Sequence, residues 1–240
     1  MRLGALALFL LLGGPAHAET VRVAVAANFT ATAEQLSRVF AQQTGHELLL
    51  SSAATGQLYA QIVQGAPFDI FLAADAERPA LAVEQGSGIE GSVFTYATGV
   101  LALYSTTLDV TGGMDVLSVE FDNLAIADPQ AAPYGRAALE VLSALGLAEA
   151  VQARLVIGDS ITQALQFVET GNAELGFVAA SQVLGKDNVW IVPTELYQPI
   201  AQDAVLLERG VANAAAGAFM QFLRGETATE IIEAAGYRRE

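Results

Sequence analysis

The sequence contains no cysteine, two histidines and one lysine among its 240 residues. The lack of cysteine excludes disulfide bonds, thiolate nucleophiles and zinc sites with cysteine ligands, so the hydrophobic core must stabilise the fold. Basic residues are also scarce, because 11 stand against 26 acidic ones and the formal net charge is −15. Nucleic-acid-binding proteins present basic surfaces to phosphates, so we expect no nucleic-acid partner. The hydrophobic content of 53% excludes an intrinsically disordered chain.

The first 18 residues have the pattern of a secretory signal peptide. Met1-Arg2 precedes an apolar run over residues 3–12, and a glycine-proline segment then leads to the small-x-small tripeptide at 16–18. The run is shorter than the ~20 residues that span a bilayer. We expect cleavage after Ala18 and a mature protein that is soluble outside the cytoplasm, with an uncleaved anchor as the alternative. Loss of Arg2 brings the net charge of the mature chain to −16.

Catalytic side chains are few in the mature chain. His46 is its one histidine and Lys186 its one lysine. A Ser-His-Asp triad or a histidine-ligated metal site would need His46, which lies in a predicted surface turn between a helix and a strand. The sequence therefore predicts no catalytic residue and no bound metal cation, and an enzyme is the least favoured class.

Predicted strands and helices alternate along almost the whole mature chain. A valine-rich strand is followed by apolar residues at helical spacing that Gly45 stops, and this order repeats. Such alternation indicates an α/β fold with parallel strands covered on both faces. The predicted strands span 21–27, 48–50, 69–73, 100–104, 124–127, 155–157, 175–178 and 200–207. The predicted helices span 30–44, 58–63, 77–85, 136–145, 160–169, 212–223 and 227–235.

The length of the mature chain favours one or two domains, and no linker rich in proline, glycine or serine divides it. We therefore predict two α/β lobes joined by strands that pass between them. Extended apolar runs near 96–104 and 196–207 are the candidate hinge strands. They assign residues 19–97 and 204–240 to the first lobe and residues 98–203 to the second.

Four predicted strand-to-helix turns consist of small or neutral hydrogen-bonding residues. Ligands of open parallel sheets bind beyond the carboxyl ends of strands, where helix N-termini direct their N–H groups. The turns at 26–30 (AANFT), 51–57 (SSAATGQ), 128–135 (DPQAAPYG) and 158–162 (GDSIT) contain no arginine or lysine. Helix capping explains each turn alone. If the four converge, however, they form a pocket of N–H and O–H donors that suits a small, fully deprotonated oxyanion.

Several segments carry a family resemblance: residues 23–29 (VAVAANF), 54–62 (ATGQLYAQI), 65–75 (GAPFDIFLAAD), 128–135 and 175–178 (LGFV). On these segments the chain resembles the periplasmic molybdate- and tungstate-binding proteins of ABC importers. The resemblance implies a two-lobed periplasmic-binding-protein fold of type II, with a mixed sheet flanked by helices in each lobe and the ligand in the interlobe cleft. It also implies a monomer without cofactor or enzymatic activity, which captures molybdate or tungstate and delivers it to the membrane subunits of an ABC permease.

The resemblance also assigns ligand positions. Asn28 matches the first-turn ligand and Thr55 the hydroxyl ligand of the second turn, while Tyr134 in the third turn and Ile161 in the fourth match positions at which the family donates a backbone N–H. Many relatives have a ligand tyrosine where this chain has Ala179. The phenol of Tyr134 is the candidate replacement, and the alternative is that only its backbone amide reaches the anion. The ligand positions are therefore Asn28, Thr55, Tyr134 and Ile161, with Ala27, Ala54, Gly56 and Ser160 as additional candidates.

Another small anion is the alternative ligand, namely sulfate, phosphate or a carboxylate. Hydrogen phosphate needs an acceptor for its proton, and Asp128 and Asp159 are the carboxylates near the turns. A carboxylate ligand favours a bidentate arginine, for which Arg136 is the nearest candidate, although we expect it at the surface. Asp69 and Asp75 are interpreted as structural residues, and Asp75 is predicted to cap the helix that follows it.

Overall fold

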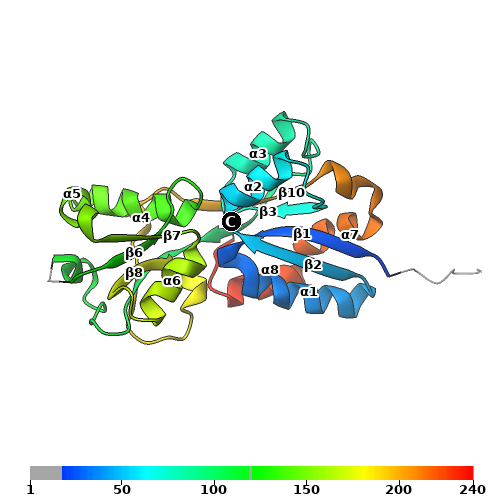
Figure 1. Ribbon diagram of the computed structural model, residues 1–240. Helices are drawn as coiled ribbons and strands as arrows, with labels where there is room; N and C mark the ends of the chain where they lie inside the picture. The colour runs from blue at the N-terminus through cyan, green and yellow to red at the C-terminus, as the bar shows by residue number, and fades with distance from the viewer. Residues whose placement is uncertain (1–17, 119–120, 240) are drawn as a thin grey trace, which may run out of the picture.

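The computed structural model describes residues 18–118 and 121–239, so the predicted leader lies outside the described residues except for Ala18. The described residues form two lobes that lie side by side, each built on a five-stranded sheet with helices packed against it (Figure 1). Both sheets are mixed, because parallel strands are followed by antiparallel ones. The predicted α/β fold with two lobes and a mixed sheet in each is confirmed.

The sheet of the first lobe has the strand order β2-β1-β3-β10-β4. β1 pairs in parallel with β2 and β3, whereas β10 pairs antiparallel with β3 and β4. Valines alternate with alanines in β1, so that Val23 packs with α1 and α8 residues on one face and Ala24 with Leu58 of α2 on the other. The strands are β1 (Thr20–Ala26), β2 (Glu47–Ala53), β3 (Ile70–Leu72), β4 (Phe94–Gly99) and β10 (Ile200–Leu206). The helices are η1 (Ala27–Phe29), α1 (Thr30–Thr44), α2 (Thr55–Val63), α3 (Glu77–Glu84), η6 (Glu208–Ala212), α7 (Ala214–Leu223) and α8 (Glu226–Ala234).

The second lobe repeats this design with the strand order β7-β6-β8-β5-β9. β6 pairs in parallel with β7 and β8, and β5 pairs antiparallel with β8 and β9. The short strand β9 was not predicted. The strands are β5 (Leu101–Tyr104), β6 (Leu124–Ala127), β7 (Leu155–Gly158), β8 (Leu175–Ala179) and β9 (Val189–Ile191). The helices are η2 (Gly113–Ser118), α4 (Pro133–Ala144), α5 (Ala148–Val151), η3 (Gln152–Arg154), α6 (Ile161–Glu169), η4 (Ala180–Gln182) and η5 (Thr194–Leu196).

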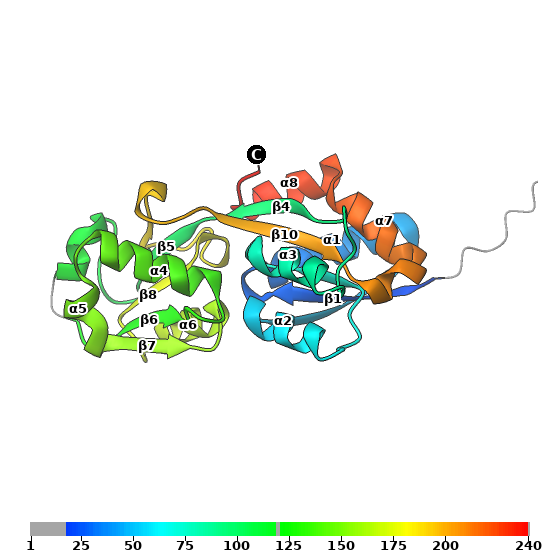
Figure 2. The same ribbon diagram turned by 90° about the horizontal axis from the view of Figure 1, so that it is seen from above.

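Two neighbouring chain segments connect the lobes. The extended run predicted over 96–104 is divided at Val100, so that β4 belongs to the first sheet and β5 to the second. The chain returns to the first lobe through β10, which pairs antiparallel with β4 from Ile200 opposite Gly99 onward, so that the two strands lie side by side (Figure 2). Our division of the chain at 97/98 and 203/204 stays a prediction.

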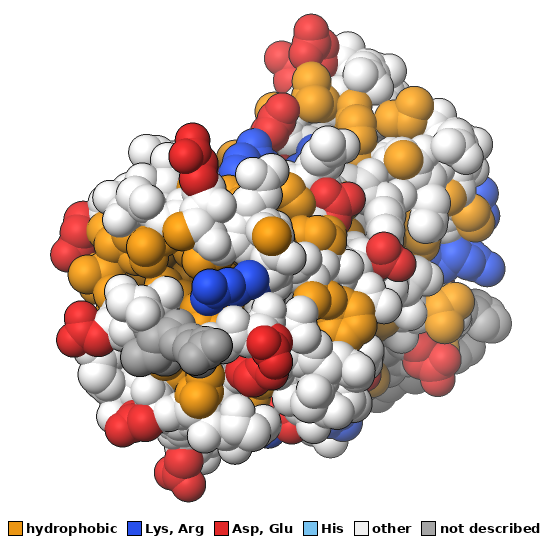
Figure 3. All heavy atoms as spheres, turned by 60° about the vertical axis from the view of Figure 1, so that its left-hand side comes forward, with side chains coloured by type: hydrophobic (Ala, Val, Ile, Leu, Met, Phe, Trp, Pro, Cys, Tyr) orange, Lys and Arg blue, Asp and Glu red, His pale blue; other side chains and the backbone are white. Residues whose placement is uncertain are grey.

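The surface is acidic and sparsely basic, as the composition requires. On the face shown in Figure 3, Asp and Glu side chains are scattered and those of Lys and Arg are few. No helix in the described part of the chain combines the length and the apolar character needed to cross a membrane.

Candidate functional site

The four predicted ligand positions meet at one small cavity between the lobes. They meet because β1, β2, β6 and β7 all end toward the opposite lobe and each is followed by a helix (Figure 1). Of the additional candidates, Ala27 and Ala54 line the cavity, whereas Gly56 and Ser160 do not. The lining consists of Ala26, Ala27, Asn28, Ala54, Thr55, Ala74, Ala132, Pro133, Tyr134 and Ile161.

Asn28 lies in η1, directly after β1, and its side chain is buried. Its Nδ2 donates to Oε1 of Gln202 at 3.0 Å and to the hydroxyl of Tyr237 at 3.1 Å. The Tyr237 hydroxyl in turn donates to the backbone carbonyl of Asn28 at 2.7 Å. The side-chain amide is thus held by the protein, while the first N–H groups of the helical segment have no partner within it and are available as donors.

Thr55 is the first residue of α2 and is 2% exposed. Its Oγ1 accepts a hydrogen bond from the backbone N–H of Ala74 at 3.1 Å. A hydroxyl that accepts one hydrogen bond still has its own proton to donate. Thr55 can therefore donate this proton to a ligand in the cavity. Gly56 serves the interlobe contact instead, because its N–H donates to the carbonyl of Ala131 at 2.8 Å.

Tyr134 and Ile161 come from the first turns of two helices in the second lobe. Pro133 begins α4 and sets Tyr134 in its first turn, where the side chain is 1% exposed and Oη accepts from Nε2 of Gln202 at 3.1 Å. Burial raises the pKa of the Tyr134 phenol well above its usual value, with a smaller contribution from Tyr237. Ile161 begins α6, which Ser160 caps by accepting the N–H of Gln163 at 3.3 Å.

The cavity wall is neutral. None of the described residues that line it carries a charged side chain, and its polar groups are one amide, two hydroxyls and the backbone of four helix starts. Helix N-termini favour negative charge through their unpaired N–H groups and their dipoles. The arrangement can therefore hold a small anion by hydrogen bonds alone. Ala179, which ends β8, is not among the residues of the lining.

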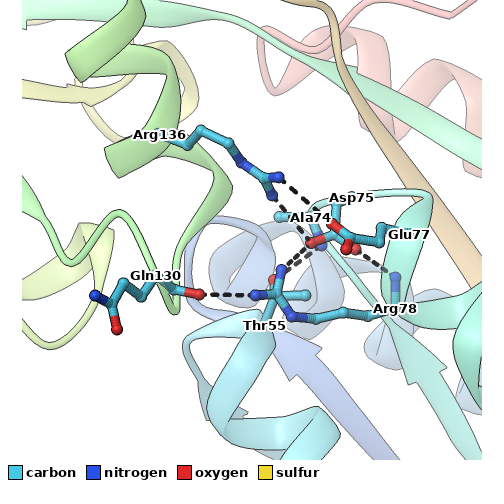
Figure 4. Close-up of polar contacts among 7 residues, drawn as sticks. All are labelled: Thr55, Ala74, Asp75, Glu77, Arg78, Gln130 and Arg136. Carbon is cyan, nitrogen blue, oxygen red and sulfur yellow. Dashed lines mark hydrogen bonds and ion pairs between the residues drawn. The ribbon is translucent and has the colours of Figure 1, made fainter.

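Charged residues lie beside this wall, in an ion-pair cluster that we define as Asp75, Glu77, Arg78 and Arg136. Arg136 of the second lobe lies 3.4 Å from Glu77 and 3.9 Å from Asp75, both of the first lobe. Arg78 pairs with Asp75 and donates to the carbonyl of Gln130 in the second lobe at 2.8 Å (Figure 4). Oδ1 of Asp75, one residue before the N-cap Ala76, also accepts the N–H of Arg78 in the first turn of α3 at 3.0 Å.

Neutral hydrogen bonds join the lobes as well. The hydroxyl of Thr162 donates to the carbonyl of Ala27 at 3.2 Å, and that of Ser181 donates to the Tyr237 hydroxyl at 3.0 Å. Apolar contacts reinforce them, because the lining alanines of the first lobe, such as Ala54, pack into the core cluster of the second. The two lobes are therefore closed on each other around the cavity.

Catalytic groups are not gathered at the cavity. Nδ1 of His46 accepts the backbone N–H of Glu19 at 3.2 Å, near the starts of β1 and β2. In the ranges 18–118 and 121–239, no group of three or more His, Asp and Glu residues could hold a metal ion.

The residues behind the wall were not predicted from the sequence. Gln202 and Tyr237 contact Asn28 across 174 and 209 positions of the chain. The one local signal is that Gln202 and Asp203 form a polar pair within the apolar run of β10.

A two-lobed α/β fold with a small ligand cavity between the lobes defines the class of solute-binding proteins that close around their ligand. Residues 21–238 match the family of bacterial extracellular solute-binding proteins, and the chain belongs to this family.

Two relatives and one solved structure extend this match. The molybdate-binding protein ModA of Rhodobacter capsulatus is 49% identical, and the alignment covers 100% of this chain and 97% of that protein. The molybdate-binding protein ModA of Azotobacter vinelandii is also 49% identical, over 95% of this chain and 93% of that protein. The structure of the Azotobacter vinelandii periplasmic molybdate-binding protein superimposes with a TM-score of 0.87 at 40% identity, covering 92% of this chain and 99% of that one.

Proposed function

We propose that this protein captures molybdate or tungstate outside the cytoplasm and delivers it to the membrane subunits of an ABC permease. The observation that carries the proposal is the neutral cavity at which four helix starts meet. Its donors include two hydroxyls, those of Thr55 and Tyr134, that already accept an N–H and keep a proton to donate. The names and high identity of the ModA relatives support the same ligand class.

Capture is proposed to proceed by closure of the two lobes. The oxyanion enters between the open lobes, and donors from both lobes then bind it in the closed form. Closure is a population shift, because the ligand binds the closed state more tightly than the open one. Interlobe contacts such as the hydrogen bond from Gly56 to Ala131 form at the same step. Each hydrogen bond to the anion contributes about 1.5–3 kcal/mol.

The ligand is identified by calorimetric titration of the mature protein with molybdate, tungstate, sulfate and phosphate. We expect sub-micromolar binding of molybdate or tungstate and much weaker binding of sulfate and phosphate. If neither metal oxyanion releases or absorbs heat, the proposal is wrong. A preference for sulfate or phosphate would assign the protein to the alternative anion class.

Thr55→Val tests whether the proposed site holds the ligand. The variant removes one donor and keeps the shape of the side chain, so we expect the molybdate Kd to rise 10- to 100-fold. Thr170→Val is the matched control, because its hydroxyl donates to the carbonyl of Gln166 near the exposed end of α6. An unchanged Kd for Thr55→Val, with an unchanged melting temperature, would place the ligand elsewhere.

Two of the alternative ligands, a carboxylate and hydrogen phosphate, lack partners at the cavity. A carboxylate would favour a free arginine, but Arg78 and Arg136 are paired with Asp75 and Glu77. Hydrogen phosphate needs an acceptor, and Asp159 lies outside the lining. We further propose that the protein has no catalytic activity, is a monomer and resides in the periplasm after cleavage behind Ala18. Sequencing the N-terminus of the exported protein and measuring its mass in solution test the last two points.

A further inference from the structure

Gln202 is a fully buried side chain that connects the two lobes directly behind the cavity. It lies on β10, where the pairing with β4 is shifted by a bulge between Gln202 and Asp203. Bulges redirect side chains, and here both neighbours are turned into the protein. The amide of Gln202 contacts Asn28 from the first lobe and Tyr134 from the second, so one side chain touches a proposed ligand residue of each lobe.

The direction of these hydrogen bonds follows from a backbone carbonyl. The carbonyl of Asn28 can only accept a hydrogen bond, so the Tyr237 hydroxyl, 2.7 Å away, donates its one proton to this carbonyl. The side-chain atom of Asn28 at 3.1 Å from the same hydroxyl must then be the donor Nδ2. The second proton of this Nδ2 points to Gln202, whose facing atom must be the acceptor Oε1. The contacts of Tyr96 are consistent with this orientation of the Gln202 amide. The Tyr96 hydroxyl donates to Gln202 Oε1 at 3.2 Å and to the carbonyl of Ala73 at 3.0 Å.

With Oε1 turned toward Asn28, the Nε2 of Gln202 donates to the hydroxyl of Tyr134. The Tyr134 oxygen is thereby an acceptor on its buried side, and its proton has to point elsewhere. Tyr134 lines the cavity, and the side chain of Asn28 is the other polar group beside its hydroxyl. An oxyanion bound in the cavity would give this proton an acceptor. Burial keeps the phenol protonated well above neutral pH.

We propose that Gln202 is a positioning residue that makes Tyr134 an obligate hydrogen-bond donor to the bound oxyanion. This inference rests on the proposed function and deepens it. An oxyanion without protons, such as molybdate, tungstate or sulfate, accepts the Tyr134 proton on any of its oxygens. Hydrogen phosphate carries a proton of its own, and the N–H of Gln202 already occupies an acceptor position of the Tyr134 hydroxyl, which leaves that oxygen a poorer acceptor for the phosphate proton. The direction of one buried amide therefore contributes to selection among anions.

Gly99 supports a close, fixed contact between these two side chains. A Cβ atom at this position would overlap the Tyr134 hydroxyl and lie 2.6 Å from Nε2 of Gln202. Gly99 is the last residue of β4, and its backbone φ is not in the left-handed region. The position therefore needs the absence of a side chain, which leaves room for the Gln202–Tyr134 hydrogen bond, more than it needs conformational freedom.

A double-mutant cycle on Gln202→Met and Tyr134→Phe tests the proposal, with the molybdate Kd and the melting temperature measured for each protein. Tyr134→Phe alone tests the direction of the hydrogen bond between Gln202 and Tyr134. If the Tyr134 hydroxyl donated to Gln202 instead of the ligand, its removal would not weaken molybdate binding. We expect each single variant to raise the Kd about 10-fold. In the Tyr134→Phe background we expect Gln202→Met to raise it less than 2-fold. Equal effects of Gln202→Met in both backgrounds would overturn the proposal.

Selectivity provides a readout that a purely structural role would not change. Gln202→Met frees the Tyr134 hydroxyl to accept a proton, so the ratio of the phosphate Kd to the molybdate Kd should fall at least 5-fold. An equal loss of affinity for phosphate and for molybdate would overturn the inference. If Gln202→Met does not fold, Tyr134→Phe decides the question, because an unchanged molybdate Kd overturns the inference. If the wild-type protein binds no oxyanion, the proposed function itself fails, whereas wild-type binding without coupling refutes only the role of Gln202.

Discussion

Two adjoining regions hold the lobes together with different chemistry. The cavity wall and the residues behind it are neutral and almost fully buried, as for Thr55 and Gln202. The ion-pair cluster is charged and in part exposed, since the side chains of Arg136 and Glu77 are 46% and 60% exposed. The two regions meet at Ala74, whose N–H donates to Thr55 and which precedes Asp75 in the chain.

The difference explains how a chain with a net charge of −15 can hold a dianion. Its global field opposes binding, so recognition has to come from local donors that are already oriented. A free cation at the wall would attract any anion, whereas neutral donors in fixed directions favour anions that match their geometry. The two arginines nearest the wall are paired with Asp75 and Glu77, and the cluster therefore keeps their charge away from the ligand.

A negative charge in the neutral wall should have the largest effect. Asn28→Asp keeps the shape of the side chain, cannot donate when ionised and adds a carboxylate beside the bound dianion. Two unit charges 4 Å apart repel by about 4 kcal/mol at an effective dielectric constant of 20. We therefore expect the molybdate Kd to rise at least 100-fold at pH 8, measured by calorimetry.

The control for this variant is Asn172→Asp, which makes the same change at an exposed position that donates to Thr170. It should leave the Kd within 2-fold of the wild-type value. Equal molybdate Kd values for Asn28→Asp and the wild-type protein would refute the hypothesis that ligand binding requires an uncharged cavity wall.

Removing a charge from the ion-pair cluster should have a moderate effect that depends on salt. Arg136→Gln breaks the exposed pair with Glu77, and such pairs contribute up to about 1 kcal/mol. We expect the molybdate Kd to rise about 3-fold at 20 mM salt and to differ little from the wild-type value at 0.5 M, where screening is strong. The loss caused by Thr55→Val should persist at both salt concentrations.

Arg154→Gln is the matched control for the cluster, because Arg154 lies over the ring of Phe121 within the second lobe. It should not change the Kd at either salt concentration. A loss for Arg136→Gln that persists at high salt would mean that this arginine acts on the ligand and not through its ion pairs.

How far the sequence predicts the molecule depends on how local each feature is. The four strand-to-helix turns are local patterns in the sequence. Residues such as Thr55 and Ile161 can therefore be assigned to the ends of parallel strands without knowledge of the cavity at which the turns converge. The exact start of α4 was missed by three residues, because Pro133 begins the helix earlier than the apolar spacing indicated.

The contacts behind the wall could not be predicted in this way. The hydrogen bond between Asn28 and Gln202 joins residues 174 positions apart. Its geometry depends on a bulge in β10, where the polar pair Gln202 and Asp203 interrupts the apolar run but does not indicate a partner. The pairing of Arg136 with the first lobe depends on lobe closure, and the prediction placed this arginine only at the surface.

Replacement of Asp203 should have the smallest effect, and this effect is on thermal stability. Asp203 lies where the neutral cavity wall and the ion-pair cluster meet. Burial raises the pKa of its carboxyl, Thr95 lowers it by donating at 2.7 Å, and the charge of Asp75 raises it further. The folded state therefore binds this proton more tightly than the unfolded state does. Stability from this group increases as pH falls from above the raised pKa toward the unfolded value of 3.8, and the ionised carboxylate lowers stability at neutral pH.

Asp203→Asn should thus raise the melting temperature by about 2 °C at pH 7 and lose this advantage as the pH is lowered toward 4, in thermal melts at matched ionic strength. Asp109→Asn gives the opposite sign, because hydrogen bonds from the hydroxyl and N–H of Thr111 lower the pKa of Asp109. If Asp203→Asn instead lowers the melting temperature at pH 7, the ionised carboxylate stabilises this boundary. Asp203 would then belong to the charged region and not to the neutral wall.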